Sequence, residues 1–262
     1  MNTTDTTDTI ESRIVTHLLA FKLTVVAQEL VSRLVQADQS VALATILEVL
    51  ELESEARHER RVTRLRRASR LPTAKTFETF DDKRLSRAVV HKLEELKVGE
   101  FVDKAVNILA FGLPGVGKSH ALAALGHSLV QQGRSVLWTP TYTIVQELLA
   151  AKRDLDLPRK LRKLDQFDLV ILDDIGYVNQ SAEEAEVLFT LLAERYERRS
   201  TAITSNLVFS EWDRIFKNKM ATSAAIDRLV HHSVVLEFAV PSYRTAKAKS
   251  KTKASPRSGP KS

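Results

Sequence analysis

The chain has 262 residues with a formal net charge of +6 at pH 7, and 44% of its residues are hydrophobic. This length allows one large hydrophobic core and a smaller second domain, and no apolar run reaches the roughly 18 residues that a membrane-spanning helix requires. The absence of cysteine excludes disulfide bonds and thiolate metal sites.

The N-terminal quarter of the chain predicts a small all-α domain. Residues 1–9 are polar and acidic, without the features of a secretory signal, and we expect them to be disordered. Residues 10–70 contain no glycine and carry apolar residues at helical spacing, such as Val26, Leu30 and Leu34. Together with the absence of cysteine, this composition predicts a cytoplasmic protein without a membrane partner.

The end of this helical region is strongly basic. Residues 57–70 hold seven arginines and one glutamate, at helical spacing and without aromatic residues between them. Such a stripe suits contact with nucleic-acid phosphates and gives no sign of base stacking on a single strand. A solvated helix face without a ligand is the alternative interpretation. The arginines that we expect to bind DNA are Arg57, Arg60, Arg61, Arg64 and Arg67.

The larger part of the chain has a different pattern. We expect residues 71–100 to be a linker, with Pro72 and Gly99 as breaks. Residues 101–243 alternate short apolar runs with amphipathic helical segments. This repeated strand–loop–helix order predicts an α/β domain with a parallel sheet flanked by crossover helices.

The first apolar run leads into a phosphate-binding loop. Residues 112–119, GLPGVGKS, fit the pattern G-x-x-x-x-G-K-[ST] between a strand-like run at 106–111 and a helix-like run at 121–131. Glycines let backbone N–H groups approach an anion, and the helix that starts here adds the positive end of its dipole. Lys118 would contact the β- and γ-phosphates, and Ser119 would bind Mg²⁺. The expected nucleotide-binding residues are Gly112, Leu113, Pro114, Gly115, Val116, Gly117, Lys118, Ser119 and His120.

A later apolar run, 169–172, ends in two adjacent carboxylates, Asp173 and Asp174. A continuous apolar run is typical of a strand buried on both faces of a parallel sheet. Because side chains alternate along a strand, the two acids should diverge where the strand ends. We assign Asp173 to the Mg²⁺ ion and Asp174 to polarising the attacking water.

Two further segments complete this domain. Ser181 and Glu184 form a capping box before a helix with an apolar face. Residues 201–205 predict another strand, and Asn206 at its end either orients the attacking water or is an ordinary turn asparagine.

The histidine pair His231–His232 is the one metal-like feature near the C-terminus. Adjacent side chains point in different directions, and no cluster of partner residues is apparent in the sequence nearby. We therefore expect no metal site there. The tail that follows, 244–262, holds seven Lys and Arg residues, no acid and few apolar residues, so we expect it to be disordered. Whether it adds salt-dependent affinity for a polyanion or is incidental stays open.

These strings resemble the IstB family of insertion-sequence transposition helper ATPases, in the AAA+ superfamily. That family is similar to the DnaC helicase loaders and the DnaA initiators. The resemblance rests on GLPGVGKSH, LVILDDIGYV, TSNLVFSEWDRIF, AAIDRLVHHSVVLEF and the following PSYR. In the N-terminal half FKLTVVAQEL, ELESEARHERRVTRLRRA and KTFETFD agree as well. The expected fold is therefore an AAA+ P-loop NTPase core with a small helical N-terminal domain.

The resemblance also implies an activity and partners. It implies an ATPase that oligomerises on duplex DNA, with ATP and Mg²⁺ at subunit interfaces, and that recruits and stimulates a partner transposase. Arg228 matches the arginine that reaches the γ-phosphate of the neighbouring subunit, where a guanidinium neutralises developing charge. Arg244 stands where a second sensor arginine would lie. In this clade a helical insertion after the second strand faces DNA, which assigns DNA contact to Lys152, Arg153, Arg159 and Lys160.

One position departs from the family pattern. Glutamate commonly follows the metal-binding aspartate, whereas this chain has Asp174. Its shorter side chain reaches about 1.5 Å less, and a misplacement of about 1 Å can cost about 10²-fold in rate. We therefore expect slow ATP turnover, with nucleotide acting mainly as an assembly switch.

Two other functions stay open. One is a helicase loader of the DnaC type, with a replicative helicase as partner. The other is a DNA-bridging protein that binds ATP without hydrolysing it, which the substituted acid Asp174 keeps open. The sequence has neither zinc-finger spacing nor an obvious base-reading helix, so DNA binding should be largely independent of sequence.

Overall fold

A computed structural model describes residues 9–176, 181–208, 211, 212, 215, 223, 226, 227 and 229–240. The chain divides into two compact units, residues 1–63 and 64–262. The division falls inside the 30-residue helix α3 (Ser40–Ser69), a few residues before the expected end of the helical domain at residue 70. The expected disordered ends lie outside the described residues, except for Thr9. No helix in the described ranges combines the length and the apolar character needed to cross a bilayer.

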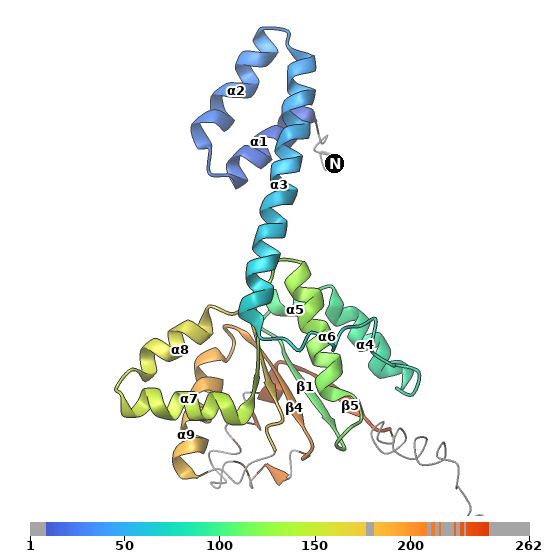
Figure 1. Ribbon diagram of the computed structural model, residues 1–262, viewed down its shortest axis with the longest axis vertical. Coiled ribbons are helices and arrows are strands. Elements are labelled where there is room, and N and C mark those ends of the chain that lie inside the picture. Colours follow the sequence, from blue (N-terminus) through green and yellow to red (C-terminus); the bar gives the residue numbers. More distant parts are fainter. Residues whose placement is uncertain are drawn as a thin grey trace, which may run out of the picture. The chain divides into compact units, whose positions relative to one another are not determined.

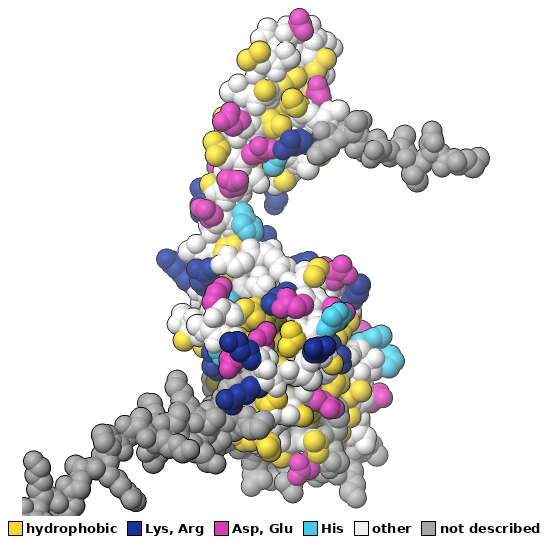
Figure 2. Space-filling model, turned by 90° about the vertical axis from the view of Figure 1, so that its right-hand side faces the viewer, with side chains coloured by type: hydrophobic (Ala, Val, Ile, Leu, Met, Phe, Trp, Pro, Cys, Tyr) yellow, Lys and Arg dark blue, Asp and Glu magenta, His cyan; other side chains and the backbone are white. Residues whose placement is uncertain are grey.

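The N-terminal unit is built from α1 (Ile10–Ala20), α2 (Thr24–Gln36) and the first part of α3 (Figure 1). The Thr9 hydroxyl caps α1 by accepting the Ser12 N–H. A small apolar core holds the helices together and contains Ile14, Leu18, Ala27, Leu43 and Leu47. Several hydrophobic side chains also remain on the surface of this unit (Figure 2), among them Val25, Val41 and Leu52. The predicted all-α N-terminal domain is confirmed.

The second unit contains a five-stranded sheet with the order β2-β3-β4-β1-β5, in which every pairing is parallel. The strands are β1 (Asn107–Gly112), β2 (Val136–Pro140), β3 (Leu169–Asp173), β4 (Ser200–Ser205) and β5 (Ser233–Phe238). β3, β4 and β1 form the centre of the sheet and are almost completely buried, which accounts for the continuous apolar runs of β1 and β3. The predicted parallel sheet is therefore confirmed.

Helices cover both faces of this sheet (Figure 1). α6 (Lys118–Gln131) packs on one face, and α4 (Arg87–Lys97) contacts both α6 and β5. On the other face lie α7 (Thr141–Arg153), α8 (Leu157–Asp165) and α9 (Ala182–Arg195), whose apolar side chains join one core cluster with the sheet. The short α5 (Glu100–Asp103) precedes β1. The capping box predicted at Ser181 and Glu184 is present at the start of α9.

The segment expected as a linker, 71–100, is part of the second unit and contains α4. Ser86 caps α4, and Val89, Leu93 and Leu96 on its inner face are buried. α4 was not predicted because its few apolar residues are dispersed in a charged segment between the expected breaks at Pro72 and Gly99. Gly99 is indeed a break, because it adopts a left-handed conformation with φ +88° before α5.

A buried arginine joins the amino-terminal edge of the sheet to the helices. The Arg195 guanidinium, at the end of α9, donates to the backbone carbonyls of Leu164, Phe167 and Ser200. Burial lowers the pKa of Arg195 to about 10, so the side chain is still charged at neutral pH. The three carbonyls satisfy its donors and make the buried charge tolerable.

Candidate nucleotide-binding site

The phosphate-loop motif forms the turn between β1 and α6. Gly112, Gly115 and Gly117 all have positive φ angles, at +148°, +80° and +104°. Gly112 also lies close to β5, because a Cβ there would be 2.6 Å from the Phe238 carbonyl oxygen. Only glycine combines this backbone conformation with this close approach. The loop conformation therefore depends on the residues that the pattern specifies.

Lys118 lies inside this loop. Its side chain is 8% exposed, and its ammonium donates to the carbonyls of Gly112 at 2.7 Å and Leu113 at 3.0 Å. α6 begins at Lys118, so the N–H groups of its first turn and the positive end of its dipole face the same loop. Ser119 follows in that first turn and is half-buried. This combination of a buried cation with the amino-terminal end of a helix is suited to an anion such as a polyphosphate.

The two acids lie where β3 ends, but the backbone at the second acid is not the strand that the prediction assumed. Asp173 is the last residue of the strand, whereas Asp174 has already left it with φ +60°. The left-handed backbone at Asp174 therefore separates the two acids, so the alternation of a continuing strand does not set the direction of the second side chain. Aspartate tolerates this conformation better than most residues with a side chain.

Thr204 of β4 holds both acids. Its hydroxyl donates to Asp173 Oδ1 at 2.7 Å and accepts the Asp174 N–H at 2.7 Å. The Thr204 carbonyl accepts the Ile175 N–H at 3.0 Å, which fixes the next residue of the turn. On the other side, Thr141 donates to the Asp173 carbonyl at 3.0 Å. Thr204 was not predicted as a site residue, because its role depends on the packing of β4 beside the end of β3 and β4 contains several other serines and threonines.

Asn206 follows β4, the strand that separates β1 from β3. The register places Ser205 opposite Phe111, so Asn206 lies at the same edge as the phosphate loop. The amide oxygen of Asn206 is buried, and within the described part of the chain no donor reaches it. It lies against Gly176, where a Cβ would be only 2.3 Å away. An unsatisfied buried acceptor beside the acid turn fits a role in holding a water molecule.

A segment that was not predicted to belong to the site packs on the first turn of α6. His120 Nε2 lies 3.0 Å from the Thr76 carbonyl oxygen and 3.2 Å from the Thr79 hydroxyl. The Phe80 ring stacks at 5.2 Å from the His120 ring and lies 3.4 Å from the Cβ position of Gly117. The KTFETFD string therefore contacts the phosphate loop, and His120 is the residue that connects them.

The basic residues predicted to bind DNA fall into two groups. On α3 all five arginines are exposed; Arg57 and Arg60 share Glu53 as an ion-pair partner, and Arg57 also lies over the Phe21 ring at 3.9 Å. The hydrogen bond from Arg57 lowers the pKa of Glu53. Arg64 and Arg67 continue the exposed face along the same helix.

In the second group, on α7 and α8, two of the four basic residues form ion pairs with acids. Lys152 pairs with Glu186 at 2.8 Å, and Lys160 pairs with Glu147. Burial alone would raise the pKa of Glu147, but the neighbouring Lys160 ammonium and Arg70 guanidinium together lower it below its ordinary value. Arg153 and Arg159 are exposed.

Two predicted residues lie outside the part of the chain that the structure describes. They are the interface arginine, Arg228, and the sensor candidate, Arg244.

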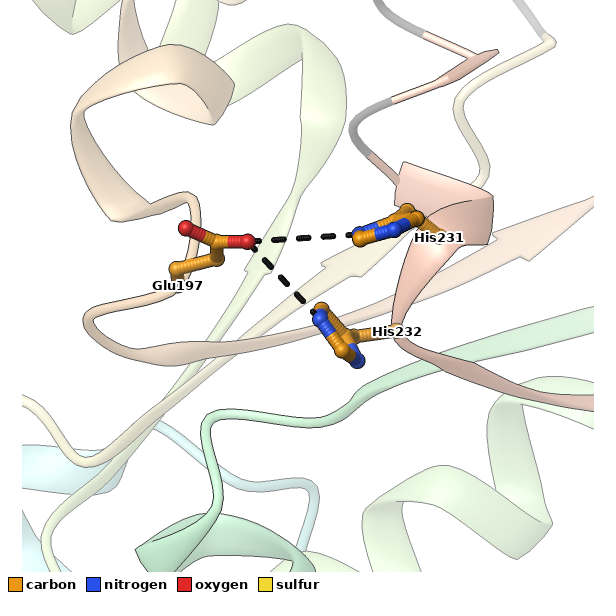
Figure 3. A group of neighbouring side chains, drawn as sticks. All are labelled: Glu197, His231 and His232. Atoms are coloured by element: carbon orange, nitrogen blue, oxygen red, sulfur yellow. Dashed lines mark ion pairs between the residues drawn. The ribbon is translucent and has the colours of Figure 1, made fainter.

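The expectation that the histidine pair has no partner group is wrong. Glu197, from the turn after α9, points at His231 and His232 (Figure 3). Glu197 is 34 positions earlier in the sequence, so inspection of the neighbouring residues missed it.

Comparison with known proteins places these features in a family. The model of the family described as IstB-like ATP binding protein matches residues 16–252. An insertion sequence ATP-binding protein from Sinorhizobium fredii is 43% identical over 201 residues, which is 76% of this chain and 67% of that protein. The ATP-binding protein of insertion sequence IS21 from Pseudomonas aeruginosa is 38% identical over 198 residues, 74% of each chain.

Solved structures show the same fold at low sequence identity. The DnaC helicase loader matches with a TM-score of 0.53 and 16% identity, over 63% of this chain and 97% of that one. The replication initiator DnaA bound to AMPPCP and single-stranded DNA matches with a TM-score of 0.55 and 18% identity, over 71% and 56% of the two chains. The second unit therefore has the AAA+ fold.

Proposed function

The chain belongs to the IstB-like ATP binding protein family, and from this premise we propose that it is an ATP-dependent transposition helper. In this proposal it oligomerises on duplex DNA and stimulates a partner transposase. The observation that carries the proposal is the buried Lys118 ammonium within a glycine loop at the start of α6. The relatives are named as ATP-binding proteins of insertion sequences, which supports ATP as the nucleotide.

The residues at this edge of the sheet fit a nucleotide with Mg²⁺. The loop N–H groups and Lys118 would hold the phosphates, and the oxygen ligands that Mg²⁺ prefers are available from Ser119 and Asp173. Bound there, the ion would neutralise charge on the phosphates. Thr204 fixes the Asp173 carboxylate by donating to one of its oxygens, which leaves the other oxygen for a ligand role.

The proposed hydrolysis uses the residues next to this pair. Asp174 accepts a hydrogen bond from the attacking water and polarises it, while the Asn206 oxygen, which no described donor reaches, accepts a hydrogen bond from the second O–H of the same water. Arg228 of a neighbouring subunit would contact the γ-phosphate, and this part of the proposal rests on the resemblance of the sequence to the family. Because Asp174 is short, turnover is slow, and bound ATP mainly controls assembly.

DNA binding is proposed for the exposed arginines of α3 and for Arg153 and Arg159 after the second strand. These side chains present guanidinium groups without a base-reading arrangement, so they would contact phosphates of a duplex. Ion pairs with acids make Lys152 and Lys160 weaker candidates, and the same holds for Arg57 and Arg60, which share Glu53.

Light scattering of the full chain tests nucleotide, DNA and assembly together. We expect a large species only when ATP and a duplex of about 50 base pairs are both present, and smaller species with ADP or without nucleotide. Lys118→Ala should weaken ATP binding by about 10- to 100-fold, because charge-assisted hydrogen bonds contribute about 1.5–3 kcal/mol each. Lys104→Ala, at an exposed lysine paired with Glu100, is the matched control. A monomer under every condition would contradict the proposal.

Phosphate release separates the remaining functions. Slow release by the wild type that Lys118→Ala abolishes supports the helper ATPase. If neither protein releases phosphate and both bind DNA equally well, the non-hydrolysing DNA-bridging function replaces it. Capture of a hexameric helicase, and not of a transposase, would indicate a loader.

A further inference from the structure

Three metal-ligand side chains meet at the edge of the sheet opposite the phosphate loop. His231 and His232 directly precede β5, and Glu197 lies in the turn between α9 and β4. Because all strands are parallel, the start of β4 and the start of β5 lie at the same edge of the sheet. The phosphate loop instead follows the carboxyl end of β1, so the two sites are separate.

Asn107, the first residue of β1, fixes the two segments that carry these side chains. Its side chain accepts the Thr201 N–H at 2.9 Å and donates to the Leu229 carbonyl at 3.4 Å, and its own N–H donates to the His232 carbonyl at 2.7 Å. Asn107 is buried, at 6% exposure. The spacing between the Glu197 turn and the histidine pair is therefore set by the sheet itself, not by flexible loops.

The three ligand atoms are close to coordination distance. Glu197 Oε1 lies 3.9 Å from His231 Nδ1 and 3.7 Å from His232 Nε2, and each residue offers one ligand atom within 4.8 Å of the others (Figure 3). Ligands at about 2.0–2.2 Å from a tetrahedral zinc ion are about 3.3–3.6 Å apart. Small rotations of these exposed side chains would bring the ligand atoms to the separations that a zinc ion requires.

We propose that Glu197, His231 and His232 form a binding site for a divalent transition-metal ion of the Zn²⁺ type. Two imidazoles and one carboxylate are a ligand set that suits zinc, whereas Mg²⁺ prefers oxygen ligands and would not select this cluster. With three protein ligands, the remaining position is open to water. The ion would join the turn before β4 to the start of β5.

The neighbouring tyrosine provides a further test of the metal site. The Tyr196 hydroxyl lies 3.2 Å from His231 Nδ1, the same nitrogen that faces Glu197. A metal ion on this nitrogen would displace the hydroxyl contact. Tyr196→Phe should therefore keep or slightly strengthen metal binding, while it removes the hydroxyl from the cluster.

The test uses the untagged full chain without nucleotide, at about pH 7.5 and with millimolar Mg²⁺ present. Zn²⁺ binding is measured by calorimetry, and Co²⁺ binding by its visible absorption. We expect one ion per chain. Each of His231→Gln, His232→Gln and Glu197→Gln should weaken binding by at least about tenfold, because even changes to outer-shell partners of metal ligands cost about 10- to 100-fold.

A second histidine–carboxylate pair provides the matched control. His91 on α4 lies 3.3 Å from Glu95 with both side chains exposed, but among the described residues no third ligand joins that pair. His91→Gln should leave the affinity unchanged. No uptake of Zn²⁺ or Co²⁺ by the wild type, or unchanged uptake by the His231→Gln/His232→Gln double variant, would overturn the proposal. Unchanged ATP binding by that double variant shows that the chain still folds, and it keeps this test independent of the proposed ATPase.

Discussion

At the scale of single residues, the acid turn depends on one hydroxyl. Thr204 is 1% exposed and connects Asp173 Oδ1 with the Asp174 N–H. The proposed roles of both carboxylates require this turn to keep its geometry. Asp173 is the last residue of β3 and Asp174 lies outside it, so strand pairing alone does not hold the two acids in place. Thr204 is thus a positioning residue. It contacts the two acids, and the acids in turn would contact the Mg²⁺ ion and the attacking water.

Replacing Thr204 with valine keeps the shape of the side chain and removes the hydroxyl. The change should cost about 1–3 kcal/mol of unfolding free energy, because the partly buried hydrogen bonds of the hydroxyl with the Asp174 N–H and the Asp173 carboxylate are lost. ATP hydrolysis should fall by at least about tenfold, with ATP affinity nearly unchanged, since a misplaced group near the chemistry is costly. Denaturant unfolding and phosphate release measure the two effects.

The control is Thr201→Val, at the other end of β4. Thr201 is also buried, and its hydroxyl accepts the Arg195 Nε–H at 3.3 Å. This variant should lose stability but hydrolyse ATP at the wild-type rate. Equal loss of hydrolysis in both variants would mean that Thr204 acts only through the stability of the strand.

The length of the Asp174 side chain is the second residue-level prediction. Asp174→Glu extends the carboxylate by one methylene and should raise the hydrolysis rate about tenfold if reach limits turnover. The same change should cost a few tenths of a kcal/mol or more, because glutamate tolerates the left-handed backbone, φ +60°, less well than aspartate. Single-turnover phosphate release measures the rate.

Asp174→Asn is the companion variant. It keeps the backbone preference and the side-chain size but removes the charge, so hydrolysis should be lost while ATP binding remains. If Asp174→Glu leaves the rate unchanged and Asp174→Asn retains it, Asp174 is not the group that polarises water.

The sequence predicted the site residues that form local patterns. The glycines, Lys118 and the acid pair form motifs within a few consecutive residues, so the phosphate loop and the end of β3 could be located from the sequence. Thr204 and Glu197 have their roles through parallel pairing and packing with distant segments. A single sequence does not specify such pairs, and the contact of Phe80 with the loop was missed for the same reason.

At the scale of elements, α7 and α8 present two kinds of basic residue. Leu157, Leu161 and Leu164 turn the apolar face of α8 toward the core. Arg153 and Arg159 are exposed, whereas Lys152 and Lys160 are paired with acids of α9 and α7. An exposed guanidinium can reach a phosphate without first giving up an ion pair.

The double variant Arg153→Ala/Arg159→Ala should therefore weaken duplex binding more than Lys152→Ala/Lys160→Ala. Each lost phosphate contact also lowers the salt dependence, so the plot of log affinity against log salt should flatten by about 2 for the arginine variant. Fluorescence anisotropy with a labelled duplex measures both quantities. Equal losses in the two double variants would show that the ion pairs do not restrain the lysines.

Element prediction worked where capping and apolar periodicity agreed. The capping box located α9, continuous apolar runs located β1 and β3, and a short β-branched run located β4. α4 was missed because its segment is rich in charge, and only every third or fourth residue, such as Val89 and Leu93, is buried. The last N-terminal helix, α3, ends at Ser69, close to the expected end of the helical region, whereas the compact units divide inside α3 at residue 63.

At the scale of the whole molecule, positive charge is concentrated in a few segments. Residues 57–70 and 244–262 each hold seven Lys and Arg residues, so the rest of the chain is net negative although the total is +6. Charge clustered in this way favours binding of a polyanion through particular segments and not through the molecule as a whole.

This distribution predicts a steep dependence of DNA affinity on salt. If about six phosphates are contacted, the slope of log affinity against log salt is about −5, and affinity falls about 10⁴-fold between about 50 and 300 mM salt. Arg64→Ala/Arg67→Ala, on the exposed face of α3, should reduce the slope by about 2 for every duplex sequence tested, because phosphate contacts carry no sequence information. Similar affinity at both salt concentrations would mean that hydrophobic or base contacts dominate. A slope that changes for only one sequence would instead place Arg64 or Arg67 at base edges.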